Sequence, residues 1–134
     1  EKEITKLNNE ILKSNMDDIL NKYEEINGTK VFTIKLKDTD ANALRDIADR
    51  IKDKNSSCVI ILASEFEGKV LFVASVTKDL NQKGVQAGNI VKQAAQIAGG
   101  GGGGRPDFAQ AGGKDASKID EALNIAKENL IKQL

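Results

Sequence analysis

The sequence predicts an α/β domain: a small mixed sheet of about four strands with helices packed on it, preceded by a long N-terminal helix. Segments with helical spacing of apolar residues alternate with short runs rich in β-branched residues, which is typical of a sheet covered by helices. Residues 57–64 are almost continuously apolar, as expected for a central strand buried on both faces. A turn at residues 65–68 then returns the chain as a hairpin.

The N-terminal helix is predicted by apolar residues that recur at three- and four-residue steps through residues 3–26. Gly28 is a suitable residue to end it. The heptad pattern breaks at Ser14, so an extended coiled coil is not supported. We therefore expect residues 1–28 to form a helix that leads in from a preceding domain, and residues 29–134 to form the globular domain.

The other elements follow from side-chain periodicity and from capping residues such as Asp40. We expect strands at Val31–Leu36, Lys69–Thr77 and Phe108–Ala111, and helices at Ala41–Asp53, Val85–Ala98 and from about Ala116.

Composition restricts the class of protein. The charges balance at 20 basic and 20 acidic residues, and 40% of the residues are hydrophobic, enough for one domain with a sizeable core. No apolar run has the length of a membrane span, so no membrane partner is expected. Cys58 stands alone in an apolar run, which predicts a buried thiol and a reducing, cytoplasmic compartment.

Nothing in the sequence supports catalysis by this chain alone. It has no histidine and no cluster of acidic residues beside a suitable ligand partner. The commonest general base and the commonest metal ligand are therefore missing. We expect no catalytic residue, no metal site and no cofactor.

The most informative segment is residues 99–113, which opens with six consecutive glycines. Glycine costs more backbone entropy on folding than any other residue, so such a run indicates close backbone approach or positive φ. We expect a structured loop shaped for a ligand. The P-loop pattern fails, because Arg105 and Pro106 stand where it requires lysine and a hydroxyl residue.

Phosphate binding is the chemistry that this segment permits. Successive backbone N–H groups can form an anion nest, Arg105 can add a bidentate contact, and the last helix begins just after Lys114. From residue 78 to 118 there are six basic and three acidic residues. The candidate nucleic-acid-binding residues are Gly101, Gly102, Gly103, Gly104, Arg105, Gln110, Gly112, Gly113, Lys114, Lys92 and Lys78.

Such a site would hold a sugar–phosphate backbone without reading bases. Five aromatic residues, none in a stacking pair by sequence, argue against a stacking platform for single strands, and shape-dependent contact with structured RNA fits better. The structural alternative is that the glycines only let the helix Val85–Ala98 turn tightly onto the sheet, with Arg105 paired to Asp107.

The stretch Gly-Gly-Gly-Gly-Arg-Pro-Asp-Phe-Ala-Gln-Ala-Gly-Gly at residues 101–113 resembles the signature of the DHHA1-type C-terminal domain of alanyl-tRNA synthetases. That family shares this module with the DHH-type phosphoesterases. Residues 87–92 resemble the start of the family's helix, and residues 73–80 resemble the strand before it.

The resemblance implies a non-catalytic domain of a cytoplasmic alanine–tRNA ligase that contacts the tRNA backbone at the elbow. It would help to present the tRNA to the aminoacylation and editing sites. The implied partners are the tRNA (alanine-specific in the full enzyme), the other domains of the synthetase and, in some members, a second copy. The glycine signature falls on Gly99–Gly104, Arg105, Pro106, Asp107, Ala109, Gln110, Gly112 and Gly113.

Two other functions stay open. The first is the substrate-binding domain of a DHH-family phosphoesterase, although those proteins usually carry histidine where this chain has Arg105. The second is an oligomerisation module that acts through residues 3–26. A free-standing editing protein is an open alternative for the parent of the domain.

Overall fold

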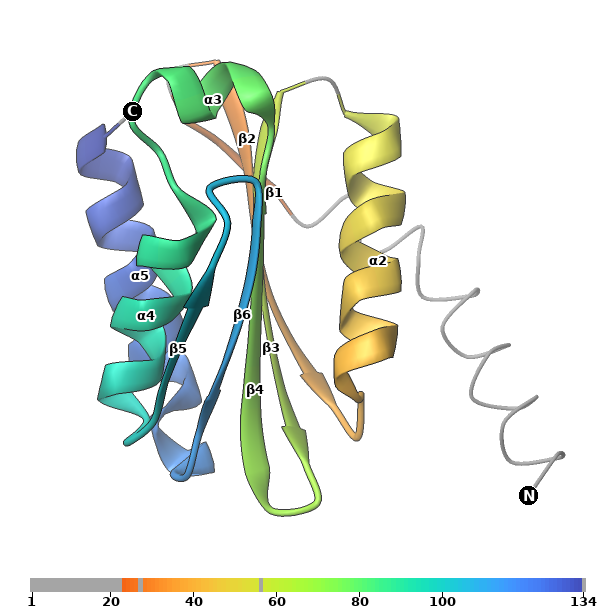
Figure 1. Cartoon of the computed structure of the whole chain (residues 1–134), viewed down its shortest axis with the longest axis vertical. Coiled ribbons are helices and arrows are strands. Elements are labelled where there is room, and N and C mark those ends of the chain that lie inside the picture. The colour runs from red at the N-terminus through yellow and green to blue at the C-terminus, as the bar shows by residue number, and fades with distance from the viewer. Residues whose placement is uncertain (1–22, 27, 56, 134) are drawn as a thin grey trace, which may run out of the picture.

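The computed structural model describes residues 23–26, 28–55 and 57–133. Six strands form one mixed sheet in the order β1-β2-β3-β4-β6-β5 (Figure 1). The pair β2–β3 is parallel and the other neighbours are antiparallel. The strands are β1 (Tyr23–Ile26), β2 (Thr29–Lys37), β3 (Cys58–Phe66), β4 (Lys69–Val76), β5 (Gly101–Gly104) and β6 (Phe108–Gly113).

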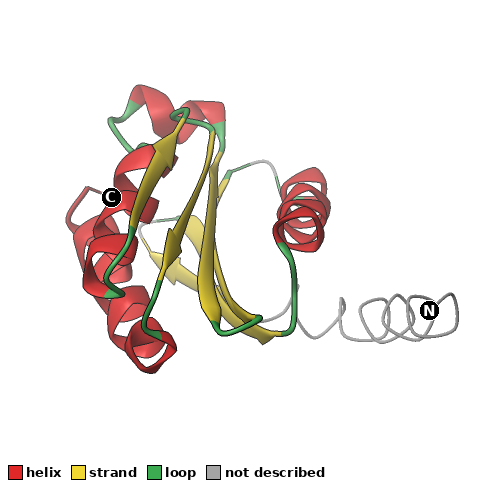
Figure 2. Ribbon diagram, turned by 60° about the horizontal axis from the view of Figure 1, so that its bottom comes forward, coloured by secondary structure: helices red, strands yellow, loops and turns green. Residues whose placement is uncertain are grey.

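Helices cover both faces of the sheet, as Figure 2 shows. The helices are α2 (Ala41–Lys54), α3 (Lys78–Gln82), α4 (Ala87–Ile97) and α5 (Ile119–Gln133), the last preceded by a 3₁₀ turn (Ala116–Lys118). One helix, α2, lies on one face, and two helices, α4 and α5, lie together on the other.

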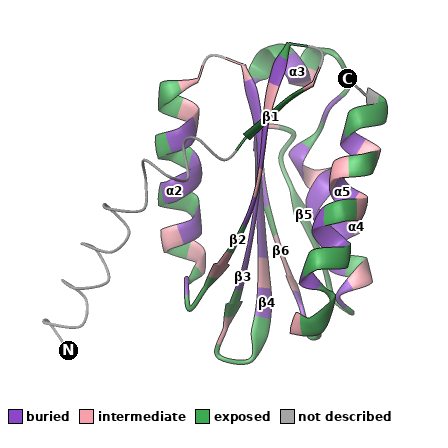
Figure 3. Ribbon diagram, turned by 180° about the vertical axis from the view of Figure 1, so that it is seen from behind, coloured by how far each residue is buried: buried purple, intermediate pink, exposed green. Residues whose placement is uncertain are grey.

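The central strand β3 joins two hydrophobic cores. Its residues 58–64 are all buried, as predicted, and Figure 3 shows the buried strands between the helical layers. Successive side chains such as Ile60 and Ile61 point to opposite faces of the sheet. One core lies beneath α2, and the other lies beneath α4 and α5.

The helix α2 follows the prediction closely. The Asp40 carboxylate accepts a hydrogen bond from the backbone N–H of Ala43 at 2.8 Å, and so caps the helix. Leu44, Ile47 and Ile51 form its buried face. At the other end, the Asn55 side chain donates to the Ile51 carbonyl at 2.9 Å.

The expectation of about four strands was wrong, and so was the helix assignment at its C-terminal end. Tyr23–Ile26 forms the edge strand β1, which pairs antiparallel with β2. Its Tyr23 ring lies against Phe32, with centroids 5.5 Å apart. Pairing with β2 holds this segment in an extended conformation, although the spacing of its apolar residues also fits a helix. The rest of the predicted N-terminal helix lies outside the described residues.

The second additional strand is β5, where a ligand-binding loop was expected. The four glycines Gly101–Gly104 pair with β6 in an antiparallel hairpin. A Cβ at Gly104 would lie 2.8 Å from the Ala109 Cα, and a Cβ at Gly88 on α4 would lie 2.9 Å from the Gly104 carbonyl oxygen. Glycine is therefore required where β6, β5 and α4 meet backbone to backbone. The close packing that the structural alternative expected is therefore present, but the ion pair that it expected is not, since none of the ion pairs among the described residues joins Arg105 to Asp107.

Adjacent glycines of β5 give a matched test of this packing. We expect Gly104→Ala to lower the free energy of unfolding by about 1–3 kcal/mol, because the new methyl group must displace Ala109. Gly103→Ala is the control, since its Cβ would meet nothing within 4 Å. Urea denaturation of both variants measures the difference. Equal stability of the two variants would contradict the close packing.

Candidate nucleic-acid interface

A groove runs along the face of the β5–β6 hairpin that looks toward α2. The buried residues beneath α2 come from β2, β3 and β4, and of the hairpin only Phe108 borders that core. The hairpin face beside α2 is consequently left open. A hollow of about 400 Å³ lies between them, lined by Arg45, Lys52, Arg105 and Gln110 among others. A second hollow of about 380 Å³ adjoins it at Gln110.

The floor of this groove is largely backbone. All four residues of β5 are exposed, and Figure 3 shows this strand as an exposed strip beside the buried strands. A Cβ at Gly101 or Gly103 would meet nothing within 4 Å, so no neighbouring group closes over these positions. A flat or extended ligand can therefore approach the main chain directly.

Three cations converge on the groove from segments far apart in the sequence. Arg45 and Lys52 come from α2, and Arg105 follows β5 directly. The four ion pairs among the described residues involve other side chains. Asp49 and Asp107 also line the groove, which leaves an excess of one positive charge.

The turn of the hairpin holds Arg105 at the end of the groove. Its backbone N–H donates to the Phe108 carbonyl at 3.0 Å. The Pro106 carbonyl that follows accepts from the backbone N–H of Ala87 at 2.9 Å and from the Asn81 side chain at 2.9 Å. The turn is thereby tied to α3 and to the start of α4, while the Arg105 side chain is exposed.

The structure brings most of the predicted site residues together. Gly103, Gly104, Arg105 and Gln110 line the first hollow. The second hollow is lined by Gly101, Gly102 and Gly112, together with Gln110.

Four predicted residues lie away from the groove. Lys78 begins α3, and Lys92 lies on α4 at the opposite face of the sheet. Lys114 follows the end of β6 that is remote from Arg105. Gly113 is buried, and a Cβ there would lie 2.6 Å from the Ala98 Cβ.

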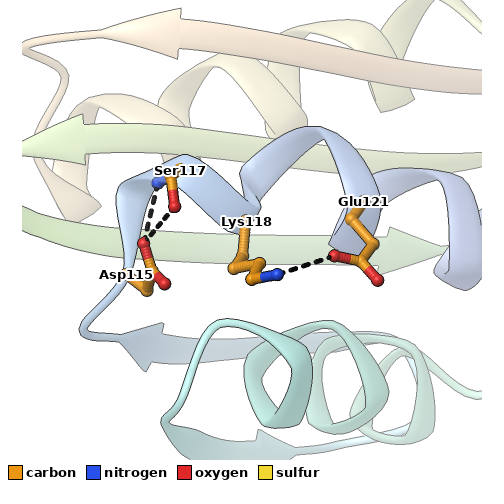
Figure 4. A network of polar contacts seen from close by, with 4 residues as sticks. All are labelled: Asp115, Ser117, Lys118 and Glu121. Atoms are coloured by element: carbon orange, nitrogen blue, oxygen red, sulfur yellow. Dashed lines mark hydrogen bonds and ion pairs between the residues drawn. The ribbon is translucent and has the colours of Figure 1, made fainter.

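The start of the last helical segment carries its own carboxylate (Figure 4). Asp115 accepts from the backbone N–H of Ser117 at 3.0 Å and from its hydroxyl, and these hydrogen bonds lower the pKa of the Asp115 carboxyl. The backbone N–H groups of Lys114 and Asp115 both donate to the Ala98 carbonyl. These two N–H groups are thus used in ending α4, and the anion that we expected near the start of the last helix would not be bound by them.

Sequence reasoning missed Arg45, Lys52 and Phe108. The two α2 cations stand more than fifty residues before Arg105, and only the sheet order places α2 beside the hairpin. The Arg45 guanidinium lies 5.2 Å from the centroid of the Phe108 ring. The exposed positions of α2 were the available signal, but a solvated helix face carries the same pattern.

Other kinds of site find little support in the described part of the chain. No group of three or more His, Cys, Asp and Glu side chains there could hold a metal ion. None of the described helices has the length and apolar character needed to cross a membrane. Cys58 is fully buried, as predicted, and burial raises the pKa of its thiol to about 11.

Comparison with protein families gives a match to the DHHA1 domain over residues 28–132. The chain belongs to the DHHA1 family. The match begins near the predicted domain boundary at residue 29 and includes the whole groove.

Among curated relatives, this DHHA1 domain is similar to a small part of much longer proteins. It is 52% identical over 134 residues to an alanine–tRNA ligase of Acetivibrio thermocellus and 53% identical over 123 residues to one of Natranaerobius thermophilus. These alignments cover 100% and 92% of this chain, but only 15% and 14% of the relatives. The chain thus spans about 15% of their length.

Solved structures agree with this likeness. The C-Ala domain from Aquifex aeolicus alanyl-tRNA synthetase superposes with a TM-score of 0.72 at 32% identity, over 80% of this chain and 96% of that domain. An exopolyphosphatase-related protein from Bacteroides fragilis has a TM-score of 0.56 at 12% identity, over 88% of this chain and 33% of that one. The second likeness shows a shared fold.

Thiol chemistry tests the burial of Cys58. At pH 8 we expect a disulfide reagent such as Ellman's reagent to label the folded domain far more slowly than the urea-unfolded chain, because the buried thiol stays protonated. Absorbance of the released thiolate measures both rates. Equal rates in folded and unfolded protein would contradict a buried, inert thiol.

Proposed function

We propose that this chain is a non-catalytic tRNA-binding domain of a cytoplasmic alanine–tRNA ligase, and that the RNA lies in the groove between α2 and the β5–β6 hairpin. The convergence of Arg45, Lys52 and Arg105 on a floor of exposed backbone carries the proposal. The whole-chain likeness to proteins named alanine–tRNA ligase supports it.

The groove suits contact with phosphates. Arg105 offers a planar fork of donors for a phosphate, and Lys52 offers a point charge. The exposed glycines of β5 let the sugar–phosphate backbone approach without meeting side chains. Contacts of this kind position an RNA by its shape, as the elbow of a folded tRNA requires, and carry little sequence information.

In this proposal the domain serves the rest of a synthetase. It would hold the tRNA while other domains of the same protein aminoacylate and edit it. The phosphoesterase alternative is less well supported, since the exopolyphosphatase-related structural neighbour shares only the fold. In addition, this chain has Arg105 at the position where the DHH-type phosphoesterases usually carry histidine. A homodimer formed through residues 3–26 stays a prediction, because most of that segment lies outside the described residues.

Binding across a salt series tests the interface. We expect the chain to bind folded tRNA more tightly than an unstructured RNA of equal length. Arg105→Ala and Lys52→Ala should each weaken tRNA binding several-fold and reduce the slope of log K against log salt by about 1, because each removes one phosphate contact. Fluorescence anisotropy with labelled tRNA measures both quantities.

Lys92→Ala is the control for this series, since Lys92 is exposed on α4 at the other face of the sheet. We expect its affinity and salt slope to equal those of the unchanged protein. If Lys92→Ala weakens binding and Arg105→Ala does not, the RNA lies on the α4 face and the proposed groove is wrong.

A further inference from the structure

One aromatic ring stands in the groove among the cations. Phe108 begins β6, is half-buried and lines the hollow of about 400 Å³. Phe32 and Phe72 are completely buried, and Tyr23 lies at the opposite edge of the sheet against Phe32. Phe108 is thus an aromatic surface that a ligand in the groove can reach.

The side chain beside this ring is a planar cation. The Arg45 guanidinium lies 5.2 Å from the Phe108 centroid, reaching across from α2 to β6. It is exposed and takes no part in the four ion pairs of the described residues. An aromatic ring and a guanidinium both stack on flat π-systems, and the pair forms one composite surface.

The neighbours of this pair leave room for a flat group. Gly103 and Gly104 lie beside it in the same hollow and carry no side chains. Gln110 is exposed and lies two residues beyond Phe108, so it projects from the same face of β6. Its amide offers a donor and an acceptor to the edge of such a group.

We infer that Phe108 and Arg45 form a stacking site for one exposed nucleobase of the bound RNA, with Gln110 at the edge of the base. The inference rests on the proposed function and deepens it, since phosphate contact alone needs no ring in the groove. The ligand class is an unpaired or terminal base of a folded RNA, whose face is open for stacking. The RNA would then be held by its backbone and by one base at the same time.

Two conservative variants separate stacking from charge. Phe108→Leu keeps an apolar side chain but removes the ring, and Arg45→Lys keeps the charge but removes the plane. Loss of one stacked base corresponds to roughly a 5- to 100-fold lower affinity for folded tRNA. Because neither variant changes the number of cations, the slope of log K against log salt should stay as in the unchanged protein. Phe66→Leu is the control, since this ring at the β3–β4 turn does not line the groove.

A direct contact gives a second readout. In the complex of this 14.4 kDa chain with tRNA, we expect nuclear Overhauser effects between the Phe108 ring protons and base protons. Circular dichroism checks that each variant is folded, and Arg45→Lys keeps the test informative if Phe108→Leu does not fold.

The outcomes distinguish the two proposals. If the unchanged protein binds folded tRNA, and both Phe108→Leu and Arg45→Lys bind it equally well, the stacking site is wrong and the tRNA-binding function stands. A loss of affinity accompanied by a smaller salt slope would also overturn stacking, because the variant would then have disturbed phosphate contacts. If the unchanged protein binds no tRNA, both proposals are wrong.

Discussion

The open face of the β5–β6 hairpin depends on backbone-to-backbone contact at Gly104 on its other side. Here α4 approaches β5 at Gly88, while β6 approaches it at Ala109 from the other side. Side chains at these points would separate the helix, the edge strand and its neighbour by the width of a methyl group or more. Since the glycines remove that spacing, the hairpin is held against α4 on one face. It needs no cover from α2 on the other.

The groove is the result of unequal cover on the two faces. On one face α4 and α5 bury the sheet as far as β6, through residues such as Ala94 and Ala109. On the other face, the buried residues beneath α2 come from β2, β3 and β4, and of the hairpin only Phe108 borders them. The cap at Asp40 and the hydrogen bond from the Thr39 N–H to the Ser64 hydroxyl, at 3.1 Å, fix where α2 begins. The position of Arg45 beside the hairpin is therefore set by the start of its helix.

The sequence predicted best where burial determines structure. The run from Cys58 to Ser64 has the composition of a central strand, and α2 has both its cap and its apolar stripe. Tyr23–Ile26 misled because four residues with apolar ends fit helical and extended spacing equally well. The strand Gly101–Gly104 could not be predicted from propensity, because glycine is among the weakest strand formers and here pairs only by its backbone.

The candidate site was predictable only where its residues lie close together in the sequence. Arg105 and Gln110 stand next to the glycines in sequence, so a local pattern was sufficient to select them. Arg45 and Lys52 reach the site only through the order of the strands, which brings α2 alongside β6. Local charge counting, in contrast, selected Lys92 and Lys114, which the fold carries to other surfaces. A site assembled across a sheet requires topology, and a single sequence gives topology poorly.

The modest charge of the groove is consistent with the role that we propose. With Asp49 and Asp107 beside its three cations, the groove has an excess of only one positive charge, and the chain as a whole is neutral. Long-range attraction to RNA is accordingly weak, and screening by physiological salt reduces it further. The shape of the groove must then supply most of the discrimination between folded tRNA and other RNA. A domain tethered to others that bind the same RNA does not need high affinity, because the tether raises its effective concentration and weak contacts still allow release.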